Sequence, residues 1–230
     1  MSVIRQPFRY ENYGAVYWLI GINVLIFVAM YYLGFSQLMD YLSMIPGLVI
    51  QGWIWTFVTY MFVHGGFSHI LFNMLALFIF GMHVERQMGS REFLLFYFIT
   101  GALAGIFSFA VYYFTGLSNL NSLHAAGLTE VTLNNLRVMH IRLMGASGAI
   151  FAVELAYAIF FPTSIIYIWG ILPLRAPVLV LGFTALELVS SIFGLNQGVA
   201  HLTHLAGFGF GWLYFVIRFG INPWRRLRLK

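Results

Sequence analysis

The sequence predicts an all-α membrane protein, a bundle of six transmembrane helices with an interfacial first loop. Of its 230 residues, 61% are hydrophobic and only 8% are charged, and the mean hydropathy is +0.86. A soluble domain carries roughly 25% charged residues, so this composition cannot cover a surface that faces water. The apolar residues also gather in stretches near the roughly 20 residues that cross a hydrocarbon core about 30 Å thick.

Six such stretches are expected as membrane helices within one domain, residues 1–230. They cover residues 15–33, 68–82, 93–114, 144–161, 177–192 and 200–219. The second could begin earlier, because residues 55–63 are also apolar. Residues 193–199, between the last two stretches, are too few to hold a folded unit.

Two connections between the predicted helices are long enough for their composition to indicate where they lie. Residues 34–53 are rich in Leu, Met and Ile around Pro46 and Gly47, so we expect them to lie half immersed in the membrane interface. Residues 115–142 contain four Asn and one Glu. We expect them to form a solvated outer loop with a short helix in its run of Leu and Asn.

The basic residues predict the orientation. Six spans place both termini and the second and fourth loops on one side, which carries ten Lys and Arg against two, Arg137 and Arg142, on the other. The ten are Arg5, Arg9, Arg86, Arg91, Arg175, Arg218, Arg225, Arg226, Arg228 and Lys230. By the positive-inside rule, both the N-terminal segment 1–13 and the basic tail 220–230 are cytoplasmic, as in a multi-pass protein of a bacterial inner membrane.

The net charge of +5 is explained by the basic tail, which we expect to bind lipid headgroups, and no nucleic-acid partner is expected. The chain has no cysteine, which excludes disulfides and thiolate chemistry. The first apolar stretch is too long for a signal-peptide core and lacks a clear cleavage site, so it is retained as a membrane helix. No pattern in the sequence fixes an oligomeric state.

Ser147 stands at the outer end of the fourth span, within Gly145-Ala-Ser147-Gly148. At a helix start, backbone N–H groups lack intrahelical partners and the dipole favours negative charge. Both features suit a serine whose attack creates an oxyanion. The alternative is that these small residues only allow close helix packing.

The sixth span carries His201 and His204, followed by Gly207 and Gly211. An ionisable residue inside a membrane segment is costly and indicates function. The two glycines lie on one helix face, close to that of His204, so they favour pressing His204 against a neighbouring helix. Alternatively, both histidines are hydrogen-bonded to buried carbonyls.

His64, His69 and Asn73 form a third polar group at the start of the second span. His69 and Asn73 are four residues apart and point the same way, and both can donate hydrogen bonds to an oxyanion. Zinc is the competing ligand, since histidines four apart bind it. Here the partner is Asn and no Glu lies between them, so no metal is expected.

Together these motifs resemble the rhomboid family, in the right order from about residue 53 to 211. The matching positions are Gly145, Ser147, Gly148 and Ala152; His204, Gly207 and Gly211; His64, His69 and Asn73; and the Glu85-centred segment 81–89. Two positions depart from the family pattern: Thr203 replaces the usual Ala before the histidine, and Trp55-Thr56 replaces Trp-Arg.

The resemblance implies a rhomboid-like bundle and an intramembrane serine endopeptidase without a cofactor. Its dyad would be Ser147 as nucleophile and His204 as general base, with no acidic third member. His69, Asn73 and the Ser147 amide would bind the oxyanion, and Phe151 would lie against the histidine. Its substrates would be transmembrane proteins, cleaved near small residues.

Glu154 and Glu187 have no role in that scheme. We expect both to be carboxyls that hold helices together. Two alternatives are that Glu187 partners His204 or that the pair forms an ion pathway. For the whole protein, the alternatives are an inactive relative that binds or chaperones membrane clients, and a small transporter, which the absence of internal repeats disfavours.

Overall fold

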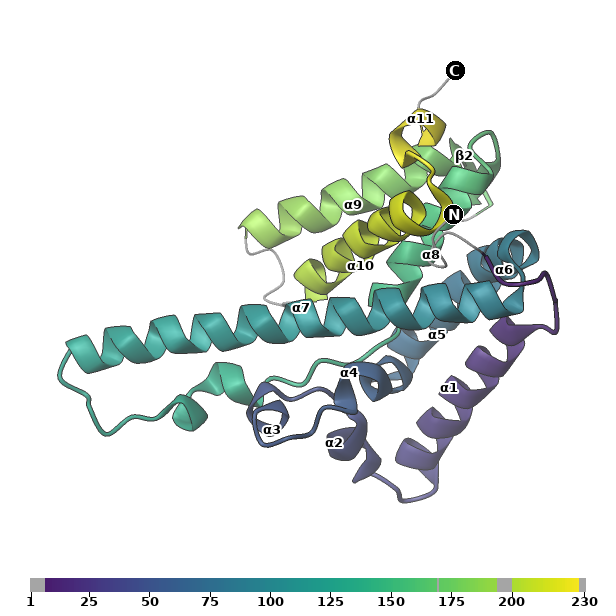
Figure 1. The fold of residues 1–230 in the computed structure, drawn as a ribbon. Coiled ribbons are helices and arrows are strands. Elements are labelled where there is room, and N and C mark those ends of the chain that lie inside the picture. The colour runs from purple at the N-terminus through teal and green to yellow at the C-terminus, as the bar shows by residue number, and fades with distance from the viewer. Residues whose placement is uncertain (1–6, 169, 194–199, 228–230) are drawn as a thin grey trace.

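The computed structural model describes residues 7–168, 170–193 and 200–227, and these are mostly helical (Figure 1). The first long helix is α1 (Ala15–Tyr32), and the connection after it contains α2 (Leu38–Leu42) and α3 (Pro46–Val49). The short α4 (Thr56–Thr59) runs into the 3₁₀ turn η2 (Tyr60–Phe62). Next come α5 (Phe67–Ala76), a π turn η3 (Leu77–Gly81) and α6 (Met82–Met88), which form one continuous helix.

The second half begins with α7 (Ser90–Ala125), followed by the 3₁₀ turns η4 (Leu133–Asn135) and η5 (Arg137–His140). Helix α8 (Ser147–Phe160) leads to an antiparallel hairpin, β1 (Ile165–Ile168) and β2 (Leu172–Arg175), with Ile165 opposite Arg175. The chain ends with α9 (Ala176–Phe193), α10 (Ala200–Tyr214), the π turn η6 (Phe215–Phe219) and α11 (Pro223–Leu227). The expected short connection at residues 194–199 lies outside the described residues.

Among the described residues, four helices are long and apolar enough to cross a membrane: α1, the α5–α6 helix, α7 and α9. Helix α8 is apolar but has only 14 residues. The count of six spans and the immersion of residues 34–53 therefore stay predictions. The chain is a multi-helix membrane protein in which most side chains of α8 are buried.

Helix α7 continues beyond residue 114, where the third span is expected to end. Helix α7 has 36 residues, which at 1.5 Å per residue is about 54 Å, well beyond a hydrocarbon core of about 30 Å. Its last turns extend past the other helices (Figure 1). The segment is not simply a solvated loop either, because Gly116 packs against Leu133 and Val138, and Met139 is fully buried.

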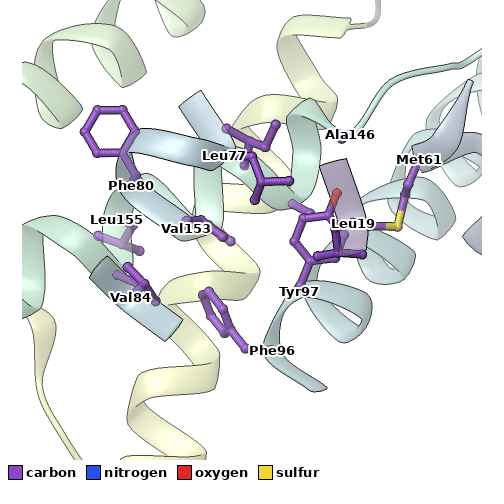
Figure 2. Close-up of a cluster of buried hydrophobic side chains, with 14 of the residues drawn as sticks. Leu19, Met61, Leu77, Phe80, Val84, Phe96, Tyr97, Ala146, Val153 and Leu155 are labelled. Carbon is purple, nitrogen blue, oxygen red and sulfur yellow. The ribbon is translucent and has the colours of Figure 1, made fainter. Parts of the chain in front are cut away.

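Helix α8 forms the centre of the packing, in contact with α7, α9, α10 and η3. Small and branched side chains such as Ala149, Ala152 and Val153 are completely buried along it. Figure 2 shows Val153 and Leu155 beside Leu77, Phe80 and Val84 of the α5–α6 helix. Small residues allow neighbouring backbones to approach closely, which helices in lipid require.

Two buried carboxylates fix the helix ends opposite the site. Glu85 accepts hydrogen bonds from the N–H groups of Ala15 at 2.6 Å and Val16 at 3.0 Å, so it caps the free donors of α1. Glu92 on α7 holds Arg218 through two contacts, of 2.8 and 2.9 Å. This bidentate pair ties the end of the α10–η6 helix to α7 and so fixes the helix that carries His204.

Candidate active site

Ser147 is the first residue of α8, and a glycine shapes the turn before it. Gly145 has φ +114°, and a Cβ at this position would lie 2.6 Å from His69 Nε2. Its N–H donates to the Tyr60 carbonyl at 2.9 Å. Residues with a side chain rarely adopt this backbone conformation, so both the turn and the contact with His69 require glycine. The turn leaves the N-terminal N–H groups of α8 beside Ser147.

The Ser147 hydroxyl lies against His204 of α10. The Oγ–Nε2 distance is 2.7 Å, which is a hydrogen bond. Phe151, one turn along α8, stacks on the imidazole with ring centroids 4.5 Å apart and planes 5° apart. Serine and imidazole in this contact have the geometry of a nucleophile and its base. His201 contacts Glu187 through its Nδ1.

Two glycines of α10 make this contact possible. A Cβ at Gly207 would lie 1.9 Å from the Gly148 carbonyl oxygen, and one at Gly211 would lie 2.9 Å from the Ala152 Cβ. Neither position has room for a side chain. Gly148 is itself enclosed, since a Cβ there would lie 3.2 Å from Thr203 Cγ2. The backbones of α8 and α10 therefore approach as closely as glycine allows, just below Ser147 and His204.

His69 and Asn73 both face Ser147 across a cavity of about 170 Å3. The Gly65 N–H donates to His69 Nδ1 at 3.3 Å, so a neutral ring carries its proton on Nε2. Asn73 donates one Nδ2 hydrogen to the His69 carbonyl at 2.8 Å, which leaves the second free. Two N–H donors are thus available beside the serine. The cavity is lined by Tyr60, His69, Asn73, Leu143, Met144, Gly145, Ser147, Thr203 and His204.

His64 lies behind this layer. It is fully buried, and its ring meets that of His69 edge-on at 5.0 Å. It precedes the membrane-crossing helix. Burial, with a smaller effect of the His69 ring, lowers the pKa of His64 to about 3. The side chain is therefore neutral, and it supports His69 instead of lining the cavity.

Glu187 of α9 is expected only to hold helices together, but it lies against the histidine that contacts Ser147. One of its oxygens is 3.1 Å from His204 Nδ1, and the other is hydrogen-bonded to His201 Nδ1. The contact with His204 has the distance of an ion pair, but its angle falls short of a hydrogen bond. Glu154, by contrast, is buried in α8 away from the serine, and its Oε2 has no partner among the described residues.

Thr203, which departs from the family pattern, has a structural partner that the sequence does not indicate. Its hydroxyl lies 2.6 Å from that of Ser108 on α7, and both side chains are buried. Tyr60 likewise donates to the Gly101 carbonyl of α7 at 2.8 Å and lines the cavity. In the described part of the chain, no three His, Asp or Glu side chains gather as metal ligands would.

The sequence is similar to known proteins over most of the region that contains these residues. Residues 51–221 match the family model of the Rhomboid domain. Over 103 residues, 44% of this chain, it is 39% identical to the rhomboid protease GluP of Bacillus subtilis (strain 168). Over 113 residues, 48% of the chain, it is 31% identical to the rhomboid protease GlpG of Salmonella choleraesuis (strain SC-B67) and of Salmonella newport (strain SL254).

The matched regions make up 20% of the Bacillus relative and 41% of each Salmonella relative, so the chain corresponds to less than half of those proteins. The family model, however, covers most of this chain and every candidate site residue named above. Its apolar helices are those of an integral membrane protein. The chain belongs to the rhomboid family.

Proposed function

We propose that this protein is an intramembrane serine endopeptidase that cleaves transmembrane protein substrates near small residues. The observation that carries the proposal is the 2.7 Å contact between Ser147 Oγ and His204 Nε2. Two further N–H donors beside the same small cavity add to it. The rhomboid relatives matched above are named proteases, which supports the same reaction class.

In the proposed reaction, Ser147 Oγ attacks the scissile carbonyl carbon while His204 Nε2 accepts the hydroxyl proton. The carbonyl oxygen becomes an oxyanion on a tetrahedral intermediate. When the intermediate collapses, the C–N bond breaks and the leaving amine takes the proton from His204. Water then attacks the acyl-serine with His204 again as base, which releases the carboxylic acid and restores the hydroxyl.

The oxyanion would be bound by the free Nδ2–H of Asn73, the Nε2–H of His69 and the backbone N–H of Ser147. Each donor is fixed before substrate arrives: Asn73 by its bond to the His69 carbonyl, His69 by the Gly65 N–H, and Ser147 by its place at the start of α8. Donors that need no reorganisation during the reaction stabilise the transition state most. The small volume of the cavity suits small residues at the scissile bond.

The proposal includes the membrane setting. The protein would cross a bacterial inner membrane six times with both termini in the cytoplasm, residues 34–53 in the outer interface and the cavity open to the outer side. The first loop supports this side of the site, because Met44 and Leu143 pair through two backbone hydrogen bonds, of 3.1 and 2.9 Å. Leu143 lines the cavity.

The test is cleavage of a generic single-span substrate by purified protein in proteoliposomes, with Ser147→Ala as the inactive variant. Ser122→Ala, at an exposed hydroxyl on α7, is the matched control and should cleave like wild type. A fluorophosphonate probe should label the wild type and the control but not Ser147→Ala. Specific binding of such substrates without Ser147-dependent cleavage would instead indicate an inactive relative that binds membrane clients.

A further inference from the structure

A carboxylate stands behind the histidine that contacts Ser147. Glu187 reaches from α9 to α10, where its oxygens contact His204 Nδ1 at 3.1 Å and His201 Nδ1. The side chains are largely enclosed, with 20% of Glu187 and 17% of each histidine exposed. The contact therefore lies in surroundings where charge interactions are stronger than in water.

The two ring nitrogens of His204 have different neighbours. Nε2 faces the Ser147 hydroxyl, and Nδ1 faces the Glu187 carboxylate. A neutral imidazole carries one proton, and a carboxylate beside Nδ1 favours the tautomer that keeps the proton there. Nε2 is then unprotonated and free to accept the serine proton. This arrangement is the one a general base requires.

We propose that Glu187 is a positioning residue for His204, which makes the site a Ser–His pair assisted by a carboxylate. The inference rests on the proposed protease function. Glu187 would fix the His204 tautomer and stabilise the imidazolium that forms when Ser147 loses its proton. The proton moves only from Ser147 Oγ to His204 Nε2 and on to the leaving amine, while Glu187 stays ionised throughout.

Other charged groups surround this contact. His201, on the same helix as His204, shares the carboxylate and holds its second oxygen in place. Glu154 from α8 interacts electrostatically with Glu187, and His69 from α5 interacts with His204. Because His201 takes part of the charge and the His204 contact is not a well-aligned hydrogen bond, the assistance should be weaker than in soluble serine proteases, where losing the acid costs about 10,000-fold.

The test compares Glu187→Gln and Glu187→Asp with Glu154→Gln. Glu187→Gln keeps the shape but removes the charge, and we expect turnover to fall about 10- to 100-fold with KM changed less than about two-fold. Fluorophosphonate labelling of Ser147 should slow by a similar factor. Glu187→Asp keeps a carboxylate one methylene farther away and should be intermediate. Glu154→Gln removes the other buried carboxyl and should cleave and label like wild type.

Wild-type turnover and labelling in Glu187→Gln would overturn the inference, as would equal losses in the Asp and Gln variants with labelling unchanged, the pattern of a purely structural role. If Glu187→Gln does not fold, Glu187→Asp decides, because a wild-type rate there contradicts the inference. The failure of the proposed function can be distinguished from the failure of this inference. If the wild type cleaves no substrate, the proposed function fails, but the labelling rates of the variants still test the role of Glu187. An unlabelled wild type would refute both.

Discussion

Gly207→Ala adds one methyl group where α10 crosses α8. The new Cβ would lie 1.9 Å from the Gly148 carbonyl oxygen and 2.7 Å from its carbon. Carbon and oxygen in ordinary contact are about 3.3–3.6 Å apart. The two backbones would therefore have to separate by about 1.5 Å at this point, since backbone atoms of a central helix cannot turn aside as a flexible side chain can.

That separation acts on the reacting atoms one turn away. The Ser147–His204 contact of 2.7 Å would lengthen toward 4 Å or so, beyond hydrogen-bond range. A displacement of about 1 Å at a catalytic contact lowers rates about 100-fold, so we expect at least that loss of turnover. Overpacking costs about 1–3 kcal/mol of unfolding free energy, and the better helix propensity of Ala offsets about 1 kcal/mol of it.

Gly209→Ala is the matched control on the same helix. A Cβ there meets nothing within 4 Å, so activity and melting temperature should match or slightly exceed wild type. Gly211→Ala, with contacts of 2.9 and 3.0 Å to Ala152, should be intermediate. Initial cleavage rates, fluorophosphonate labelling and melting temperature in detergent measure all three. A wild-type rate in Gly207→Ala, or equal losses in Gly207→Ala and Gly209→Ala, would refute the close-packing argument.

Asn73→Ala should lower turnover about 100- to 1000-fold while KM changes little, because its amide would bind an oxyanion that forms fully only in the transition state; unchanged turnover with a raised KM would make Asn73 a substrate contact. His204→Ala should abolish cleavage, whereas His201→Ala, which loses only the second support of Glu187, should keep a measurable fraction; the reverse pattern would exchange the two assignments. The pKa of His64 is about 3 in the folded protein and about 6.5 in the unfolded chain. The folded state therefore loses stability as the pH falls from 6.5 toward 3, by about 2 kcal/mol at about pH 5. His64→Phe removes that dependence, so its melting temperature should fall less than that of wild type between about pH 7.5 and 5, and an equal fall would contradict the burial argument. Deleting the exposed residues 127–130 should leave folding and cleavage intact, whereas Met139→Ala, fully buried, should cost about 2–5 kcal/mol; loss of folding in the deletion would show that this turn is structural.

The close contact of α8 and α10 could be predicted from the sequence because it depends on local spacing. Residues three and seven after His204 return to nearly the same face of a helix. Glycine on that face leaves a backbone that another helix can touch. The structure has both glycines against α8 and His204 against Ser147. The catalytic roles of these residues remain predictions until the variants are measured.

The length of α7 could not be predicted in the same way. Hydropathy falls after residue 114, and that fall marks where the chain can leave the hydrocarbon, not where its helical hydrogen bonds stop. No proline interrupts the helix between Phe114 and Ala125, so it continues into the solvated region. There it packs through Gly116 on the 3₁₀ turns that follow. The order of a polar segment depends on such tertiary contacts, which composition does not reveal.

The contact of Glu187 with His204 could be predicted only in part from the sequence. Helix α9 begins at the end of the molecule where α10 finishes (Figure 1). At the opposite ends of these helices, Glu187 is six residues before the last residue of α9, Phe193, and His204 is four residues after the first residue of α10, Ala200, so at 1.5 Å per residue both lie about 6–9 Å from those ends. The positions of the two residues along their helices therefore indicate a similar depth in the bundle.

The partner of Glu187 could not be predicted from the sequence in the same way. Helix α9 buries Ala176, Pro177, Leu179 and Val180 at its start, and further along Thr184, Glu187 and Ser191 lie on one half-buried face. This pattern indicates which face of α9 turns away from lipid, but not which side chain Glu187 meets there. A carboxylate facing lipid would be costly, whereas the same carboxylate facing two imidazoles is paired. This pairing adds to the packing of α9 against α8 and α10, so removing the charge should loosen α9 as well as His204.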